Sequence, residues 1–309
     1  DLLREYFPAT AREAAGEELL GEHRLRRRIV ATRLSNLFVD LMGAAGHVEL
    51  VRETGQSTGD VLRAWYCAYR IGRVEELRRR LFEMDYRVAA GVQIQWFLKI
   101  SKVLERATRW LLTNASRERP IRETIERFRG PADQLRDALP DLLIHRRGEE
   151  LSRLRTHHET DGLEPGPAGA LATLEFLDDL LPVADLARES GLASTVVGEV
   201  FFGLAREIDF PWLEDALDRA VGGDLWEQRA AKSLALELET ARAEMTASIV
   251  RQMDEPADVN AALRGFRKAF APDLDRIAQV LEDVRSVDRP ALPALMVAVH
   301  AIENRVSGG

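Results

Sequence analysis

The chain has 309 residues and a formal net charge of −8, and 30% charged with 46% hydrophobic residues is typical of a globular protein that folds around its own core. The single cysteine, Cys67, excludes an internal disulfide framework and a zinc site built from cysteines. The longest run without charged residues, Pro290–Ile302, is too short to span a bilayer, so we expect a cytoplasmic protein without membrane contact. The net negative charge argues against broad binding to nucleic acid.

An all-α fold is predicted along the whole chain, because Ala, Leu, Arg and Glu dominate and apolar residues recur at spacings of three and four. After an N-terminal segment, residues 1–22, a helical stripe from Leu25 to Leu41 opens a first helical half, residues 23–158. A long helix is expected at about Val88–Thr113. No run alternates β-branched residues, which argues against a parallel sheet and a nucleotide-binding α/β domain.

A linker rich in Gly and Pro is predicted at residues 159–168, followed by a second helical half, residues 169–309, with a long helix at about Leu225–Met253. The net charge is +6 through His158 and −14 from Glu159 onward. This split suggests that the halves face each other or face complementary neighbours, and a drift in the composition of exposed faces is the alternative.

Prolines are expected near helix starts, where a missing N–H group costs little. The prolines predicted to lie near helix starts are Pro8, Pro120, Pro131, Pro140, Pro182, Pro211, Pro256, Pro272 and Pro290.

An internal repeat relates the two halves. Residues 52–55, Arg-Glu-Thr-Gly, recur at residues 188–191 as Arg-Glu-Ser-Gly, and at the same offset Trp65 and Tyr66 match two phenylalanines. Each copy is predicted to end a helix at its glycine and to restart near a capping serine, Ser57 or Ser194. The sequence therefore predicts two sequential, duplicated helical halves in a multi-helix bundle. A chance resemblance between two helix–turn–helix segments is the alternative.

The standard catalytic and nucleotide-binding motifs are missing. The sequence has no G-x-G-x-x-G turn, no G-x-x-x-x-G-K-[ST] loop, no G-x-S-x-G elbow and no H-E-x-x-H helix. We therefore assign no catalytic, cofactor-binding or metal-binding residue.

Two polar clusters have alternative interpretations. His157, His158, Glu159 and Asp161, with His145 upstream, lead into the predicted linker, so we interpret them as a solvated linker and keep a metal site as the alternative. The arginines of the first predicted helix form a candidate interface, and an ordinary solvated or ion-paired face is the alternative. The interface residues are Arg24, Arg27 and Arg28.

Several segments of the chain resemble the C-terminal region of the large bacterial NAD-specific glutamate dehydrogenases. The segment Leu104–Leu112, Leu-Glu-Arg-Ala-Thr-Arg-Trp-Leu-Leu, is the most specific of them. The others include Leu3–Pro8, Arg27–Thr32 with Asn36, and Val200–Phe202 with Trp212. The resemblance covers essentially the whole chain.

The resemblance implies a parent enzyme that uses NAD to deaminate glutamate oxidatively to 2-oxoglutarate and ammonia. Its catalytic lysine lies in a glycine-rich setting, and none of Lys99, Lys102, Lys232 and Lys268 has that setting, so no catalytic or NAD-binding residue is transferred. The region is expected to serve assembly, core support or regulation, with the catalytic core of the same chain and other copies of the parent as partners. A stand-alone helical domain that binds a metal or a small molecule is the alternative.

Overall fold

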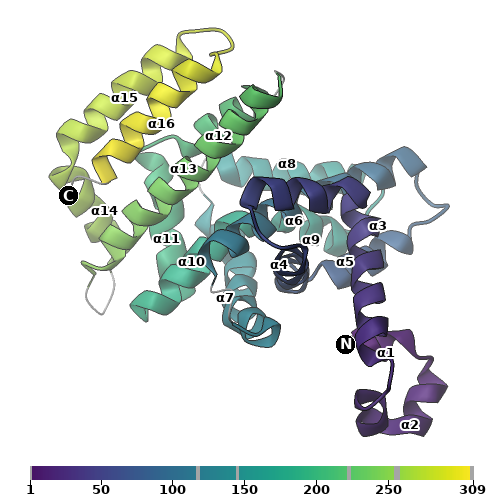
Figure 1. Cartoon of the computed structure of the whole chain (residues 1–309). Helices are drawn as coiled ribbons and strands as arrows, with labels where there is room; N and C mark the ends of the chain where they lie inside the picture. Colours follow the sequence, from purple (N-terminus) through teal and green to yellow (C-terminus); the bar gives the residue numbers. More distant parts are fainter. Residues whose placement is uncertain (1, 116–118, 144–145, 221–223, 254–257, 307–309) are drawn as a thin grey trace. The chain divides into compact units, whose positions relative to one another are not determined.

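Every regular element in the part of the chain that the computed structural model describes, residues 2–115, 119–143, 146–220, 224–253 and 258–306, is helical (Figure 1). This confirms the all-α prediction. The helices are α1 (Leu2–Tyr6), α2 (Ala9–Gly21), α3 (Arg26–Thr54), α4 (Thr58–Ile71), α5 (Val74–Phe82), α6 (Ala90–Asn114), α7 (Ile121–Leu142), α8 (Arg146–Thr160), α9 (Pro165–Leu174), α10 (Leu177–Ser190), α11 (Ser194–Gly203), the 3-10 helix η1 (Leu204–Arg206), α12 (Phe210–Ala220), α13 (Leu225–Val250), α14 (Val259–Ala269), α15 (Ala271–Arg285) and α16 (Leu292–Val306).

The chain forms two compact units that do not follow the sequence order. Unit 1 contains Asp1–Ala132 and Arg153–Leu181, and unit 2 contains Asp133–Ser152 and Pro182–Gly309. Helices α7, α8 and α10 therefore each contribute residues to both units. The predicted halves divide the chain once, at a linker. The units differ from them because residues 133–152 belong to unit 2 and residues up to 181 belong to unit 1.

The predicted linker is also more helical than the sequence suggested. Helix α8 continues to Thr160 and α9 begins at Pro165, so only the short stretch 161–164 of the range 159–168 lies between helices. A proline in the first turn of a helix loses no hydrogen bond, so Pro165 is compatible with the start of α9. Leu163 and Ala168 of this stretch are buried, whereas Gly162, Pro165 and Gly166 are exposed.

The core of unit 1 forms where α4 packs against α3 and α6. Trp65 on α4 is fully buried, stacks on Tyr69 with ring centroids 5.4 Å apart and meets Phe38 of α3 edge-on at 5.0 Å. Trp96 and Ile100 of α6 are also buried. The long helix predicted at Val88–Thr113 is confirmed by α6.

The core of unit 2 is arranged around α13, which confirms the second long predicted helix. This helix packs against α11, α12, α14 and α16, and α15 packs on α16 (Figure 1). The side chains buried along it are mostly apolar, but Arg242 is buried as well, with 2% of its surface exposed.

The predicted repeat matches the observed register of the helices. Gly55 ends α3 and Gly191 follows α10, and both glycines have a left-handed φ, 66° and 75°, which a residue without a Cβ atom adopts at little cost. Ser57 caps α4 as predicted, since its hydroxyl accepts the N–H of Asp60. The prediction for Ser194 is wrong, because Ala193 is the N-cap residue and the Ser194 hydroxyl donates to Gln134 at 2.9 Å instead.

The two helix pairs that follow begin in the same register. The offset that carries Gly55 onto Gly191 also carries the start of α4, Thr58, onto the start of α11, Ser194. It likewise carries the start of α5 onto the start of α12. We call α4 with α5 the first corner, and α11 with α12 the second corner. A common origin of the two halves stays a prediction.

Three of the prolines do not lie at helix starts, so that part of the prediction is wrong. Pro131 and Pro140 lie inside α7, and Pro182 lies inside α10. An internal proline costs a helix about 3 kcal/mol. The apolar faces outweigh this cost, because Leu135 and Leu139 beyond Pro131 are fully buried.

None of the described helices combines the length and the apolar composition that crossing a bilayer requires.

Candidate functional site

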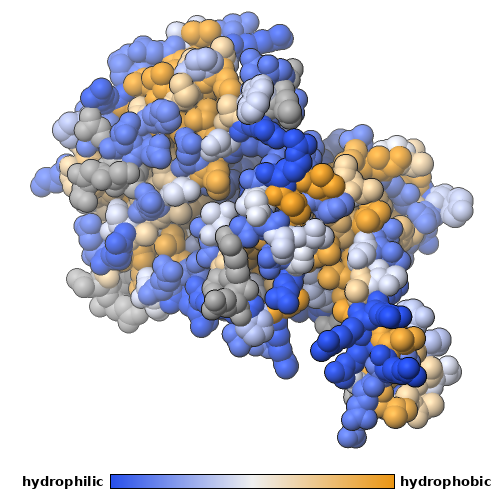
Figure 2. Space-filling model, viewed as in Figure 1, coloured by the Kyte–Doolittle hydropathy of each residue, from blue (hydrophilic) through white to orange (hydrophobic). Residues whose placement is uncertain are grey.

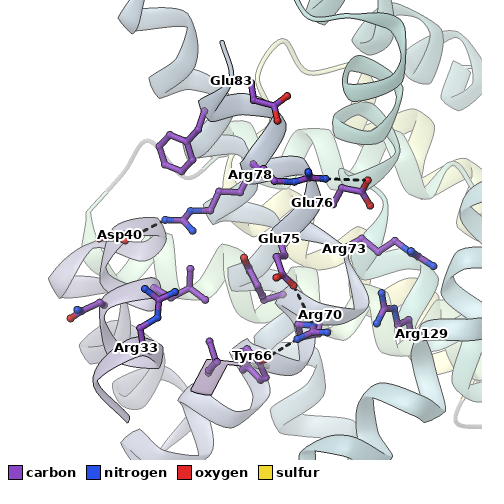
Figure 3. Close-up of a pocket in the computed structure, with 16 residues that line it drawn as sticks. Arg33, Asp40, Tyr66, Arg70, Arg73, Glu75, Glu76, Arg78, Glu83 and Arg129 are labelled. Carbon is purple, nitrogen blue, oxygen red and sulfur yellow. Dashed lines mark hydrogen bonds and ion pairs between the residues drawn. The ribbon is translucent and has the colours of Figure 1, made fainter. Parts of the chain in front are cut away.

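The main candidate site is a cavity of about 930 Å³ in unit 1, which we call the arginine cavity (Figure 3). Helices α3, α4, α5 and α7 supply most of its lining. Its charged lining residues are Arg33, Arg70, Arg73, Arg78, Arg79 and Arg129, with Asp40, Glu75, Glu76 and Glu83. The apolar and aromatic lining includes Leu37, Tyr66, Tyr69 and Phe82.

The tight turn of the first corner positions these arginines. Gly72 follows α4 at a place where a Cβ atom would lie 3.0 Å from the side chains of Leu174 and Leu177. Arg73, the next residue, has a φ of 53°, a left-handed conformation that costs a non-glycine residue about 1–2 kcal/mol. The packing of the corner thus holds Arg73 in a strained conformation at the cavity, as is often seen at functional sites.

The acidic lining residues pair with some of the arginines. Arg70 donates to the hydroxyl of Tyr66 at 3.0 Å and lies 3.8 Å from Glu75. Arg78 lies 3.5 Å from Asp40 and its guanidinium carbon is 4.9 Å from the centre of the Phe82 ring. These contacts fix the orientation of the guanidinium groups, and each pair is partly exposed, so each contributes little to stability.

The lining carries an excess of positive charge, since six arginines face four carboxylates. Figure 3 shows Arg70, Arg73 and Arg129 along one side of the view, and Arg33 and Arg78 with Asp40 along the other. Guanidinium groups bind carboxylates and phosphates through paired hydrogen bonds. The arrangement is therefore suited to an anion.

The sequence analysis missed these residues. It selected Arg24, Arg27 and Arg28, which are exposed at the start of α3 and do not line the cavity. Their role as an interface stays a prediction. The run Arg78-Arg79-Arg80 was the available signal, but only the tertiary structure brings Arg33 and Arg129 to the same cavity.

The segment Leu104–Leu112 has a structural role in unit 1. Arg106 donates from Nε to Asp178 at 2.6 Å and thereby connects α6 to α10. Arg109 donates to Glu53 of α3 at 2.8 Å and to Glu105 at 2.7 Å. Burial by itself lowers the pKa of Arg109, but these two carboxylates outweigh it and raise the pKa above its usual range.

His158 is fully buried, so the interpretation of the histidine pair as a solvated linker is wrong for this residue. Its Nε2 lies 3.7 Å from Glu175 Oε1, which accepts a hydrogen bond from Lys99 at 2.9 Å. Burial raises the pKa of Glu175, but the interactions with His158 and Lys99 outweigh burial and lower it. His157 is largely exposed, 3.6 Å from Asp161, and His145 lies outside the described residues.

Another cluster could hold a metal ion. Glu237 of α13 and His300 with Glu303 of α16 each offer a ligand atom, and these atoms lie within 4.8 Å of one another. Glu237 also accepts from Ser233 at 3.2 Å, and His300 is 47% exposed. The cluster that the sequence suggested around His157 is not among the metal-compatible groups of the described residues.

Cys67 is buried in α4. Burial raises the pKa of its thiol to about 12, so the reactive thiolate is scarce at neutral pH.

Comparison with known proteins identifies the family of the whole chain. The family described as "Glutamate dehydrogenase, C-terminal" matches residues 1–304. The chain is 26% identical over 296 residues to the NAD-specific glutamate dehydrogenase of Halomonas elongata. This alignment covers 96% of this chain and 18% of that protein. It is 24% identical over 300 residues to the NAD-specific glutamate dehydrogenase of Pseudomonas aeruginosa, covering 97% of this chain and 18% of that protein.

A more distant relative gives the same coverage. The NAD-specific glutamate dehydrogenase of Mycobacterium tuberculosis is 22% identical over 311 residues, covering 99% of this chain and 19% of that protein. The chain therefore spans less than a fifth of the length of the curated relatives that it matches.

Proposed function

The chain belongs to the glutamate dehydrogenase C-terminal family, and on this basis we propose that it is a non-catalytic region of an NAD-dependent glutamate dehydrogenase. The parent reaction would be the oxidative deamination of glutamate to 2-oxoglutarate and ammonia, with NAD bound by the catalytic core of the same chain. This region would serve the assembly, support or regulation of that core. The match over nearly the whole chain to less than a fifth of each relative carries the proposal.

The internal contacts of the chain support a structural role rather than a chemical one. The family-like segment Leu104–Leu112 uses its arginines to join α6 to α3 and α10, and these side chains are already engaged with carboxylates. An arginine held in this way orients helices, and it is not presented to a substrate.

Exposed apolar side chains offer contact points for the core or for other copies of the parent. Leu19, Ile94 and Trp226 are 63%, 57% and 71% exposed. Figure 2 shows hydrophobic residues in several separate patches between hydrophilic ones on the face in view. Such patches, together with Arg24, which precedes α3, and Arg27 and Arg28 in its first turn, are the surfaces that we propose for these contacts.

The test compares the full-length parent with a version truncated before Asp1. Light scattering would measure the mass of the assembly, and NADH formation from glutamate and NAD would measure activity in the same samples. A smaller assembly with lower activity supports a role in core support, and a retained assembly with altered cooperativity supports regulation. Unchanged mass, rate and cooperativity would contradict the proposal.

A second candidate, small-molecule binding, is favoured by the arginine cavity. Its volume of about 930 Å³ lies within the range of about 300–1,000 Å³ that is usual for ligand pockets. This function is compatible with the first, since a ligand bound here could be the signal that a regulatory region transmits.

A further inference from the structure

We propose that the arginine cavity binds a small multivalent oxyanion, whose phosphate or carboxylate groups are held by Arg73 and Arg129 on one side and Arg33 and Arg78 on the other (Figure 3). This deepens the proposed function, because it rests on a regulatory role and names the chemistry of the signal.

The first argument is the local charge. The chain as a whole carries −8, which repels anions, whereas the cavity lining carries six arginines against four carboxylates. An anion that binds here must therefore be attracted by the local field of the cavity and not by the overall charge. With positive groups on both sides, the lining favours an anion with more than one charged group over a single small ion.

The second argument is an unsatisfied donor. The Nε–H group of Arg78 is buried from solvent and has no hydrogen-bond acceptor among the described residues. Leaving a buried donor unpaired costs about 1–3 kcal/mol. An oxyanion oxygen within reach of this guanidinium would supply the missing acceptor.

The third argument comes from the matching helices of unit 2. At the offset that the two corners share, Arg78 and Arg79 of α5 correspond to Glu214 and Asp215 of α12. A helix of this register thus folds with acidic residues at the same positions. Folding of a corner in this register therefore does not by itself require arginines at these two positions, which is consistent with a role in binding.

Direct titration of the 309-residue chain tests the proposal. Isothermal calorimetry at physiological ionic strength, in a buffer free of divalent metal ions and of polycarboxylate chelators, would use inorganic tripolyphosphate as the phosphate probe and tricarballylate as the carboxylate probe. We expect at least one of the two probes to bind at a single site. The probe that binds more tightly shows whether the cavity prefers phosphate or carboxylate groups. Failure of both probes to bind at millimolar concentration would overturn the proposal.

Variants locate the site. Arg129→Gln, on the half-buried face of α7, is expected to weaken binding at least tenfold, whereas Arg122→Gln, on the same helix but exposed and outside the cavity, is expected to change it less than twofold. The double variant Arg78→Glu with Arg79→Asp, which copies unit 2, is expected to abolish binding. Circular dichroism melting checks that each variant folds.

The outcome of the titration is separable from the proposed function. Equal affinity of Arg129→Gln and the unmodified chain would place the anion elsewhere and overturn this inference alone. If truncation of the parent still changes its assembly, the region remains a structural support without the anion site.

Discussion

The first and second corners share a helix register but carry opposite charges. The three matched positions that differ most are Arg73 against Asp209, Arg78 against Glu214 and Arg79 against Asp215. Both corners bury an aromatic residue of their first helix, Trp65 of α4 in one and Phe201 of α11 in the other. The two corners therefore share their helix register and a buried aromatic residue. The charge at their matched positions differs with the groups that those side chains contact.

In the second corner, arginines from other helices of unit 2 neutralise the acids. Glu214 accepts hydrogen bonds from Arg242 at 3.4 Å and from Arg147, and Asp209 lies 2.6 Å from Arg285. In the first corner, the arginines line an open cavity together with too few carboxylates to balance them. The acids of the second corner thus lie in ion pairs between helices, whereas the arginines of the first corner line a cavity in which positive side chains outnumber carboxylates.

Removal of the buried arginine of unit 2 should have the greatest consequence. Arg242 lies 3.8 Å from the ring centre of Phe201 and bonds Glu214, so Arg242→Ala leaves a cavity and a carboxylate without this partner. We expect the free energy of unfolding to fall by about 3–5 kcal/mol, measured by urea denaturation. Arg264→Ala on the exposed face of α14 is the control, with an expected change below about 0.5 kcal/mol. Equal changes in both variants would show that Arg242 is not a structural centre.

A matched pair of glycine substitutions tests the shared register. Gly55→Ala and Gly191→Ala each force a Cβ atom into a left-handed conformation, and no side chain lies within 4 Å of either position. We expect each variant to lose about 1–2 kcal/mol of stability, and the two losses to be similar. A loss at one glycine and none at the other would indicate that the two corners are built differently.

The half-buried carboxylate of Glu175 in unit 1 predicts a pH dependence. The pKa of Glu175 is lower in the folded chain than in the unfolded chain, because Lys99 and His158 outweigh burial. Its contribution to stability is therefore complete above the unfolded pKa of about 4.3 and is lost as the pH falls through the folded value. Urea denaturation from neutral to acidic pH, through this range, should show a weaker pH dependence for Glu175→Gln than for the unmodified chain. Identical profiles would contradict the shift.

A charge swap in the first corner should matter least. Arg79 is 63% exposed and 3.9 Å from Glu76, so Arg79→Asp, which copies Asp215 of unit 2, should change the free energy of unfolding by less than about 0.5 kcal/mol. Thermal melting at neutral pH measures it, with Arg122→Gln as a control on another exposed helix face. A large loss of stability would show that the arginines of this corner hold the fold together.

Local patterns in the sequence were enough to predict the helical class, the two long helices and the two glycine-terminated helix ends, because these depend on propensity and on the spacing of apolar residues along one helix. The repeat also predicted that a new helix begins shortly after each of these glycines, near Ser57 and near Ser194. These features need only neighbouring residues to interact.

Long-range packing decided how the chain is divided and where charge gathers. Residues 133–152 belong to unit 2, whereas the following residues 153–181 belong to unit 1. Pro131 and Pro182 lie inside helices, because the burial of whole helix faces outweighs the local cost of a proline. His158 was expected in solvent and is buried beside Glu175, which follows the next helix along the chain, α9. The arginine cavity likewise combines α3, α5 and α7, and no local pattern reports which distant helices will meet, since that depends on the tertiary contacts of the whole unit.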